Sequence, residues 1–230
     1  MEIVHNLNIK KLSLIVFAVL SAVIFLAQSS MASAYVYCPG VNNKIVYKSR
    51  KSGDYEIYSA DYDRTTGTIS NDVNLSKSTG NQDAYGHVSF DGGKVVFGSM
   101  RDGNSEIYMV NIDGNGLVRL TSNASYDDFP AVSENGAKVV YMANVSGNPE
   151  IFVVNGDGSG STNISNNAAS ETYPTITADG SKVIFTSDRD GPVDIYSMNI
   201  DGTNVQRLTS DSDEQRHPSV NPEGTKIVYT

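Results

Sequence analysis

Four polar side chains recur at one position of a repeated pattern and could together bind a cation. Asp83, Asp127 and Glu171 are spaced 44 residues apart, and Gln215 follows at the same interval. Each stands two residues ahead of an aromatic residue or a histidine. Carboxylate and amide oxygens are the ligands that a hard cation such as Ca²⁺ takes. We therefore expect a calcium site at Asp83, Asp127 and Glu171 if the repeats converge; the alternative is that these side chains cap loops or face water.

Two histidines are further candidates for ligand binding. His87 and His217 lie in the same kind of segment, but they are offset by two places and are not equivalent. No Ser, Cys or third ligand accompanies them in the pattern of a catalytic triad or a zinc site. We treat Gln215, His87 and His217 as candidate binding residues. The sequence predicts no catalytic residue, and no cofactor apart from the calcium hypothesis.

A long internal repeat must position these residues. Five lysines open similar apolar runs, and their separations are 50, 44, 44 and 44 residues. Twelve residues after each of the first four comes an acid followed by Ile and an aromatic residue. A fixed period of this length is typical of a β-propeller, in which each repeat forms one four-stranded blade. The lysines are Lys44, Lys94, Lys138, Lys182 and Lys226.

Each repeat divides into four short strands separated by glycine-containing turns. Asp-Gly pairs such as Asp157-Gly158 are strong hairpin signals. The second strands, such as Val95-Val96-Phe97, are apolar on both sides of the pleat, so both faces of each sheet should be covered. In the first repeat six extra residues predict a longer loop around Arg64 to Asp72. The chain is thus predicted to be all-β, a propeller of about four and a half repeats in an incomplete ring, with units at 35–82, 83–126, 127–170, 171–214 and a partial 215–230.

The best copies of the repeat resemble the WD40-like repeat of the TolB family. They run from Pro174 to Thr209 and from Ser89 to Thr121, and 187–191 reads Ser-Asp-Arg-Asp-Gly. The resemblance extends over essentially all of 35–230. It implies a propeller that is exported beyond the cytoplasmic membrane and serves as a non-catalytic binding scaffold. Similar repeats also occur in propeller domains attached to peptidases and other enzymes.

The first 34 residues have the order of a secretory signal peptide. Lys10 and Lys11 precede an uncharged apolar run from Leu12 to Ala27, and Ala32-Ser33-Ala34 follows. Cleavage after Ala34 would give a periplasmic, extracellular or cell-surface protein. An uncleaved membrane anchor is the alternative. The formal net charge of −9 argues against nucleic acid as a partner, and the single cysteine, Cys38, excludes an intramolecular disulfide.

Two further expectations concern the end of the last repeat and the surface. The fifth repeat stops at Thr230 after two strands, which predicts an unpaired strand edge and suggests a truncated chain or a partner that supplies the remainder. Asn-x-Ser sequons offer glycosylation sites if the host modifies them, although Asn and Ser are also common in turns. The sequons begin at Asn74, Asn123, Asn144 and Asn163.

The leading hypothesis from the sequence is an exported, non-catalytic propeller scaffold. Loops at a propeller mouth are held on a rigid frame, and thirteen tyrosines suit contacts to a protein partner or a small ligand there. The competing hypothesis is the propeller portion of a larger secreted hydrolase or lyase. A structural cell-surface repeat protein is the third.

Overall fold

The computed structural model describes residues 2–3, 33–37, 43–145 and 147–230, and this part of the chain is all-β. The predicted signal segment, 1–34, lies outside the described residues apart from 2–3 and 33–34, so the signal helix is untested. Within the described ranges there is no helix with the length and apolar character needed to cross a membrane.

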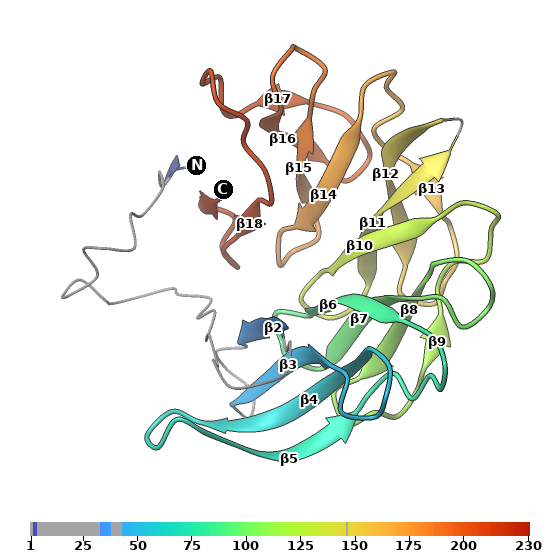
Figure 1. Ribbon diagram of the computed structural model, residues 1–230. Coiled ribbons are helices and arrows are strands. Elements are labelled where there is room, and N and C mark those ends of the chain that lie inside the picture. The colour runs from blue at the N-terminus through green and yellow to red at the C-terminus, as the bar shows by residue number, and fades with distance from the viewer. Residues whose placement is uncertain (1, 4–32, 38–42, 146) are drawn as a thin grey trace.

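Four antiparallel sheets of four strands each form the blades, which we number 1 to 4 in chain order (Figure 1). Blade 1 contains β2 (Ser33–Tyr37), β3 (Lys44–Ser49), β4 (Glu56–Asp63) and β5 (Thr68–Asn74). Blade 2 contains β6 (Asp83–Val88), β7 (Lys94–Ser99), β8 (Glu106–Asn111) and β9 (Val118–Arg119). Blade 3 contains β10 (Asp127–Val132), β11 (Lys138–Val145), β12 (Asn148–Asn155) and β13 (Thr162–Asn163). Blade 4 contains β14 (Glu171–Ile176), β15 (Lys182–Ser187), β16 (Asp194–Asn199) and β17 (Gln206–Arg207).

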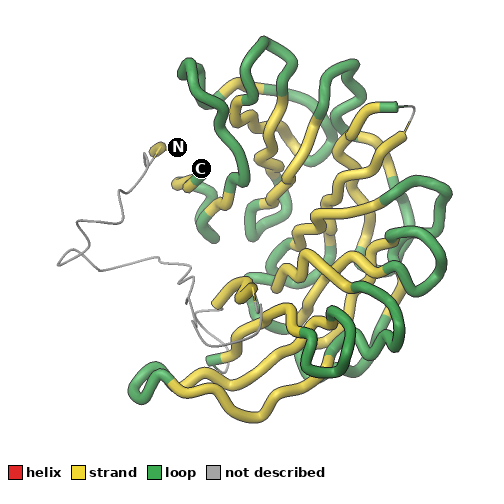
Figure 2. The backbone as a smooth tube through the Cα atoms, viewed as in Figure 1, coloured by secondary structure: helices red, strands yellow, loops and turns green. Residues whose placement is uncertain are grey.

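The blades fan around a common axis, with the first strand of each blade innermost (Figures 1 and 2). Inner strands β6, β10 and β14 contact one another in sequence. The prediction of an all-β propeller built from four-stranded blades is therefore confirmed.

Apolar side chains on both sides of each second strand hold neighbouring blades together. Val95, Val96 and Phe97 of β7 are all fully buried. Val95 and Phe97 pack toward blade 1, while Val96 packs toward blade 3. Because side chains alternate across a strand, a run that is apolar throughout fills two interfaces at once. A separate hydrophobic cluster lies between each pair of successive sheets, which confirms that both faces of blades 2, 3 and 4 are covered.

The Asp-Gly hairpins form as predicted. At Asp157 a carboxylate oxygen accepts the Ser159 N–H at 2.9 Å, and Gly158 has a φ of +85°. A side chain at Gly202 would also collide with the Ile164 carbonyl, 2.4 Å from the Cβ position. Turns of this kind thus need glycine for two reasons: the backbone has a positive φ, and a segment of the preceding blade comes too close for a side chain.

Blade 1 differs from the prediction of a long loop. The extra residues lengthen the hairpin instead, so that β4 has 8 residues, β5 has 7, and the turn between them covers 64–67. Because Asp63 pairs with Thr68, the backbone N–H and C=O groups of the inserted residues hydrogen-bond to one another across the hairpin. In a loop these groups would depend on water for their hydrogen bonds.

The last sheet corrects the expectation of an unpaired edge. It consists of β18 (Ser219–Val220), β19 (Lys226–Val228) and β1 (Glu2–Ile3), in the order β1-β19-β18. β1 runs parallel to β19, with Glu2 opposite Lys226 and Ile3 opposite Ile227. Residues from the two ends of the chain thus share one sheet (Figure 1). In the uncleaved chain this pairing gives the backbone groups on one side of β19 a partner. Removal of 1–34 as a signal peptide would take β1 away and leave that edge open.

Candidate site at the mouth of the propeller

Four ring-bearing residues on the innermost segments adopt a backbone conformation that is rare for such side chains. Tyr85, Phe129, Tyr173 and His217 have φ values of 55°, 51°, 50° and 52°. Bulky residues seldom occupy the left-handed region, and strain of this kind is concentrated at functional sites. The first three sit where the pairing of the inner strand shifts register, for example between Asp128 and Ala131 of β10. The shift is a β-bulge, which re-aims the side chain.

These four rings pack against one another from blade to blade. The ring centroids of Tyr85 and Phe129 are 4.0 Å apart, those of Phe129 and Tyr173 4.7 Å, and those of Tyr173 and His217 4.2 Å. Tyr85, Phe129 and Tyr173 are partly exposed, and His217 is exposed. We call these four rings the aromatic ladder, and we call the end of the propeller at which β6, β10 and β14 begin the mouth. The ladder presents a continuous aromatic surface across four repeats.

The structure places the predicted calcium ligands behind the ladder. Asp83, Asp127 and Glu171 are the first residues of β6, β10 and β14, and all are fully buried. Each has its own surroundings. Among the described residues, no three acidic, histidine or cysteine side chains lie close enough to hold one metal ion. Calcium binding by these carboxylates stays a prediction that this arrangement does not support, and calorimetry with millimolar calcium tests it.

The three carboxylates differ in how well they are paired. Glu171 accepts hydrogen bonds from Arg189 at 2.7 Å and from Ser187 at 2.9 Å. Asp83 is one methylene shorter; its nearest cation, Arg101, is 3.6 Å away, and neither carboxylate oxygen has a hydrogen-bond partner. Incomplete pairing of a buried carboxylate is costly.

Blade 3 has no arginine at the position of Arg101 and Arg189, because the repeat places Val145 there. Asp127 accepts the Asn123 amide at 2.7 Å through Oδ2, and its Oδ1 has no partner. Asp128, also buried, lies beside it. Burial raises the pKa of Asp83, of Asp127 and of Asp128 to about 6. These carboxyls therefore titrate close to neutral pH.

A second buried acid in each blade has a structural role. At the start of the third strand a carboxylate accepts a hydrogen bond from a Ser or Thr hydroxyl of the outer segment, and the same hydroxyl accepts the N–H of the next residue. In blade 2, Thr121 donates to Glu106 at 2.6 Å and accepts the Ile107 N–H at 2.9 Å. The equivalent pairs are Glu56 with Ser76, Glu150 with Ser165, and Asp194 with Thr209. These contacts fix the outer strand to the blade.

The predicted binding residues fall into different environments. The His87 side chain is partly buried, its Nδ1 has no partner, and burial lowers its pKa to about 4. His217 belongs to the ladder, and its Nδ1 lies 3.3 Å from the Thr230 hydroxyl. The Gln215 amide donates to the Asp213 carbonyl at 3.1 Å. Of the sequence candidates, only His217 joins the exposed aromatic surface.

The rim of the mouth carries apolar and acidic side chains. Met100 and Tyr126, in the loops around blades 2 and 3, are 39% and 48% exposed. On the side of blade 4, the segment 210–214 reads Ser-Asp-Ser-Asp-Glu and is exposed throughout. We call it the acidic segment. Gln215 and Arg216 separate it from His217, and Arg216 pairs with Glu214, so Asp211 and Asp213 bring negative charge near one end of the aromatic ladder.

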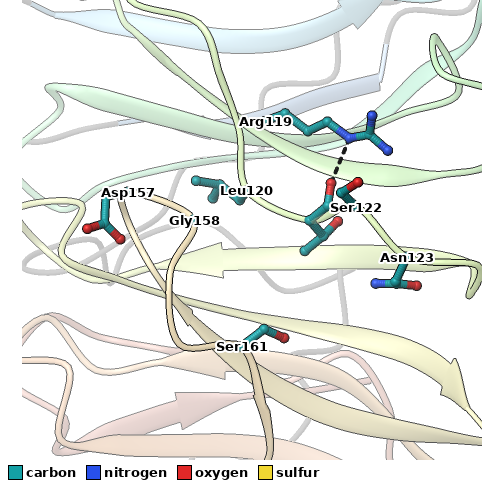
Figure 3. A pocket seen from close by; sticks show the side chains of 8 residues that line it. Arg119, Leu120, Ser122, Asn123, Asp157, Gly158 and Ser161 are labelled. Carbon is teal, nitrogen blue, oxygen red and sulfur yellow. Dashed lines mark hydrogen bonds between the residues drawn. The ribbon is translucent and has the colours of Figure 1, made fainter.

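A separate open pocket of about 400 Å³ lies between blades 2 and 3, away from the inner strands (Figure 3). Arg119 lines it and donates through Nε to the Thr121 carbonyl at 2.7 Å. The same guanidinium pairs with Asp102 and Glu106, at 2.9 and 3.1 Å. The guanidinium nitrogens of Arg119 thus already have partners within the chain. The lining residues are Arg119, Leu120, Thr121, Ser122, Asn123, Asp157, Gly158 and Ser161.

Comparison with known proteins agrees with this architecture. Residues 128–230 match the family model described as TolB beta propeller domain. This part of the chain is thus similar to a TolB β-propeller domain, and the described residues form four-stranded propeller blades. Its structure resembles that of TolB from Acinetobacter baumannii, with a TM-score of 0.69 and 24% identity over 84% of this chain and 48% of the other. It also resembles the structure of a putative TolB from Agrobacterium tumefaciens, with a TM-score of 0.65 and 22% identity over 86% of this chain and 75% of the other.

The chain spans about half the length of the Acinetobacter protein, of which 48% is covered. A nidogen/laminin complex contains a third similar structure, with a TM-score of 0.61 and 12% identity over 76% of this chain and 66% of that one. Hydrolases and a lyase also share the fold. At these identities the likeness establishes the fold, and function rests on the site. No curated protein sequence matches the chain.

Sequence reasoning named the acids at this position and missed the rings. The signal was present, since Tyr85, Phe129, Tyr173 and His217 are 44 residues apart and the last three each precede a proline. The bulge that turns the rings toward each other was not predicted.

Proposed function

We propose that this TolB-like propeller is an exported, non-catalytic scaffold that binds a protein partner at its mouth. The observation that carries the proposal is the aromatic ladder: four equivalent rings held at positive φ and in contact across blades. Core packing alone does not need partly exposed rings in a strained conformation. A rigid surface with aromatic side chains is suited to recognition, because tyrosine and phenylalanine bury much area with few rotatable bonds.

Export is supported by the basic, apolar and small-residue order of 1–34. Sequencing of the mature N-terminus and fractionation of cells test it. A start at Tyr35 in the exported fraction is expected, whereas full-length protein confined to the cytoplasm contradicts this part of the proposal.

Site-specific photo-crosslinking tests the binding function. A photoreactive amino acid replaces Tyr126 at the mouth or, as a matched control, Val118 on the outer edge, which is 39% exposed. We expect a discrete protein adduct from the mouth position only, and we expect Phe129→Leu to reduce it. No adduct, or the same adducts from both positions, would count against a binding mouth.

The competing function is a propeller portion of a larger secreted hydrolase or lyase. Hydrolysis of peptide or polysaccharide substrates by the purified chain, lost on substitution of residues at the mouth, would establish it in place of the scaffold.

A further inference from the structure

The chemistry of the mouth narrows the class of partner, and this inference rests on the proposed binding function. We propose that the mouth recognises an extended peptide segment of its partner through a lysine or arginine side chain laid against the aromatic ladder. Three features of the mouth favour such a ligand: the partly exposed aromatic rings, the distribution of charge around them and the apolar rim.

The ladder supplies the surface that attracts a cation. Aromatic faces carry negative charge density, and a guanidinium or ammonium group within about 6 Å of a ring centroid is stabilised by it. Elsewhere in this chain the same pairing is used: the Arg101 guanidinium lies 4.5 Å from the Tyr108 ring centroid, and that of Arg189 5.0 Å from Tyr196. At the ladder, successive rings are tilted or edge-on, with interplanar angles of 42°, 71° and 48°. Phe129 and Tyr173 are partly exposed and His217 is exposed, so the ladder offers ring surface to a ligand.

The electrostatic field favours the same ligand. Asp211, Asp213 and Glu214 of the acidic segment are exposed, and Arg216 forms an ion pair with Glu214 at 2.9 Å. Behind the rings lie the buried carboxylates Asp83, Asp127, Asp128 and Glu171, of which only Glu171 has an arginine within 3 Å. The chain as a whole has a formal net charge of −9. A cationic side chain is drawn to this field, and an anionic one is repelled.

The charge is also unevenly distributed around the mouth. The turn of blade 1, on the other side of the axis, carries Arg50 and Lys51. The Arg50 guanidinium lies 4.9 Å from the Tyr55 ring centroid, and Lys51 pairs with Asp72 at 2.7 Å. The basic residue of the peptide is therefore expected over Phe129, Tyr173 and His217, on the side of blade 4. Met100 and Tyr126 at the rim provide apolar contacts for the neighbouring peptide residues.

Three capped pentapeptides test the inference: Gly-Pro-Xaa-Pro-Gly with arginine, its uncharged isostere citrulline, or glutamate at Xaa. Ring-proton resonances of Phe129, Tyr173 and His217 are followed by NMR on the full chain at low salt. We expect the arginine peptide to bind about three- to fivefold more tightly than the citrulline peptide, the factor that an exposed cation–π contact provides. The glutamate peptide should bind most weakly.

Matched variants assign the effect to the ladder and to the acidic segment. Phe129→Leu keeps the apolar volume and loses the π face, so it should lower arginine-peptide affinity by a similar factor, whereas Tyr173→Phe should not. Phe152→Leu, which removes a ring stacked on Tyr141 in blade 3, is the control and should change nothing. The double variant Asp213→Asn with Glu214→Gln should weaken binding at low salt and match the wild type at 0.5 M salt, where charges are screened.

Equal binding of the three peptides, or no binding of the arginine peptide, would overturn the cationic preference. Persistence of the Tyr126 adduct in that case would leave the proposed binding function standing, so the two failures can be told apart.

Discussion

The carboxylate of Asp128 occupies the space that a side chain at Gly98 would need. A Cβ at Gly98, in blade 2, would lie 2.6 Å from Oδ1 of Asp128, in blade 3. The two residues are 30 positions apart, and neither is typical of its place in the repeat: Met142 and Thr186 are the equivalents of Gly98, and Ala84 and Thr172 those of Asp128. The contact is therefore a departure from the repeat that is confined to one blade interface.

Gly98→Ala should destabilise the propeller by about 1–3 kcal/mol, because overpacking forces the buried Asp128 to move. Urea denaturation measures the loss. Gly98 does not have a positive φ, so backbone strain makes no contribution. The double variant with Asp128→Ala should recover most of the stability; equal destabilisation of single and double variants would disprove the coupling.

Stability should be greater at pH 5 than at pH 7.5, on the order of 2 kcal/mol. Burial raises the pKa of Asp83, Asp127 and Asp128 from 3.8 to about 6, so between these values the folded chain holds protons that the unfolded chain has released. The free energy of unfolding therefore falls as pH rises through this window. His87 opposes the trend, because burial lowers its pKa from 6.5 to about 4 and its protonation favours the unfolded chain.

Thermal unfolding across pH 4.5 to 8 measures this profile. The triple variant Asp83→Asn, Asp127→Asn and Asp128→Asn should lose most of the advantage at pH 5, leaving the opposing effect of His87 and the contribution of Glu171, whose pKa is also raised by burial. An unchanged profile in the triple variant would show that these carboxyls are not responsible.

Thr121→Val should cost about 1–3 kcal/mol, since it leaves both the Ile107 N–H and a Glu106 carboxylate oxygen without this hydroxyl in a buried site. Thr121→Ser keeps the hydroxyl and is the matched control. Chemical denaturation of the two variants separates the hydrogen bonds from the methyl group. Thr209→Val should behave in the same way, because Thr209 connects Ile195 with Asp194.

Glu171→Asp should destabilise the protein by about 1–2 kcal/mol, because the shorter side chain withdraws from Arg189 within blade 4, as Asp83 is withdrawn from Arg101 within blade 2. The reciprocal Asp83→Glu should stabilise the protein by part of that amount, because the longer side chain reaches Arg101 in blade 2. Calorimetry measures the Tm of both variants. We expect Glu171→Asp to lower Tm and Asp83→Glu to raise it; a lower Tm in both would argue against side-chain length as the cause.

The sequence was sufficient for the repeat, the hairpins and the two-sided burial of strands such as β7, because these follow from local pattern. It located Asp83, Asp127 and Glu171 at equivalent positions, but it could not show that they are buried behind Tyr85, Phe129 and Tyr173, since that depends on the bulge in each inner strand. The repeat could not predict the Gly98–Asp128 contact, because both residues differ from those at the same positions of the other repeats. Part of the sequon pattern also has a structural explanation: in Asn163-Ile164-Ser165 the serine binds Glu150, and the asparagine accepts the Ser165 N–H.

The aromatic ladder has a consequence for how such a protein can grow. Four copies each carry one ring of the ladder, and successive rings contact one another from one copy to the next. A duplicated segment inserted between two blades would therefore arrive with the partner that each neighbour requires. Gene duplication can lengthen or shorten this array one unit at a time, and the inner surface stays continuous at every step.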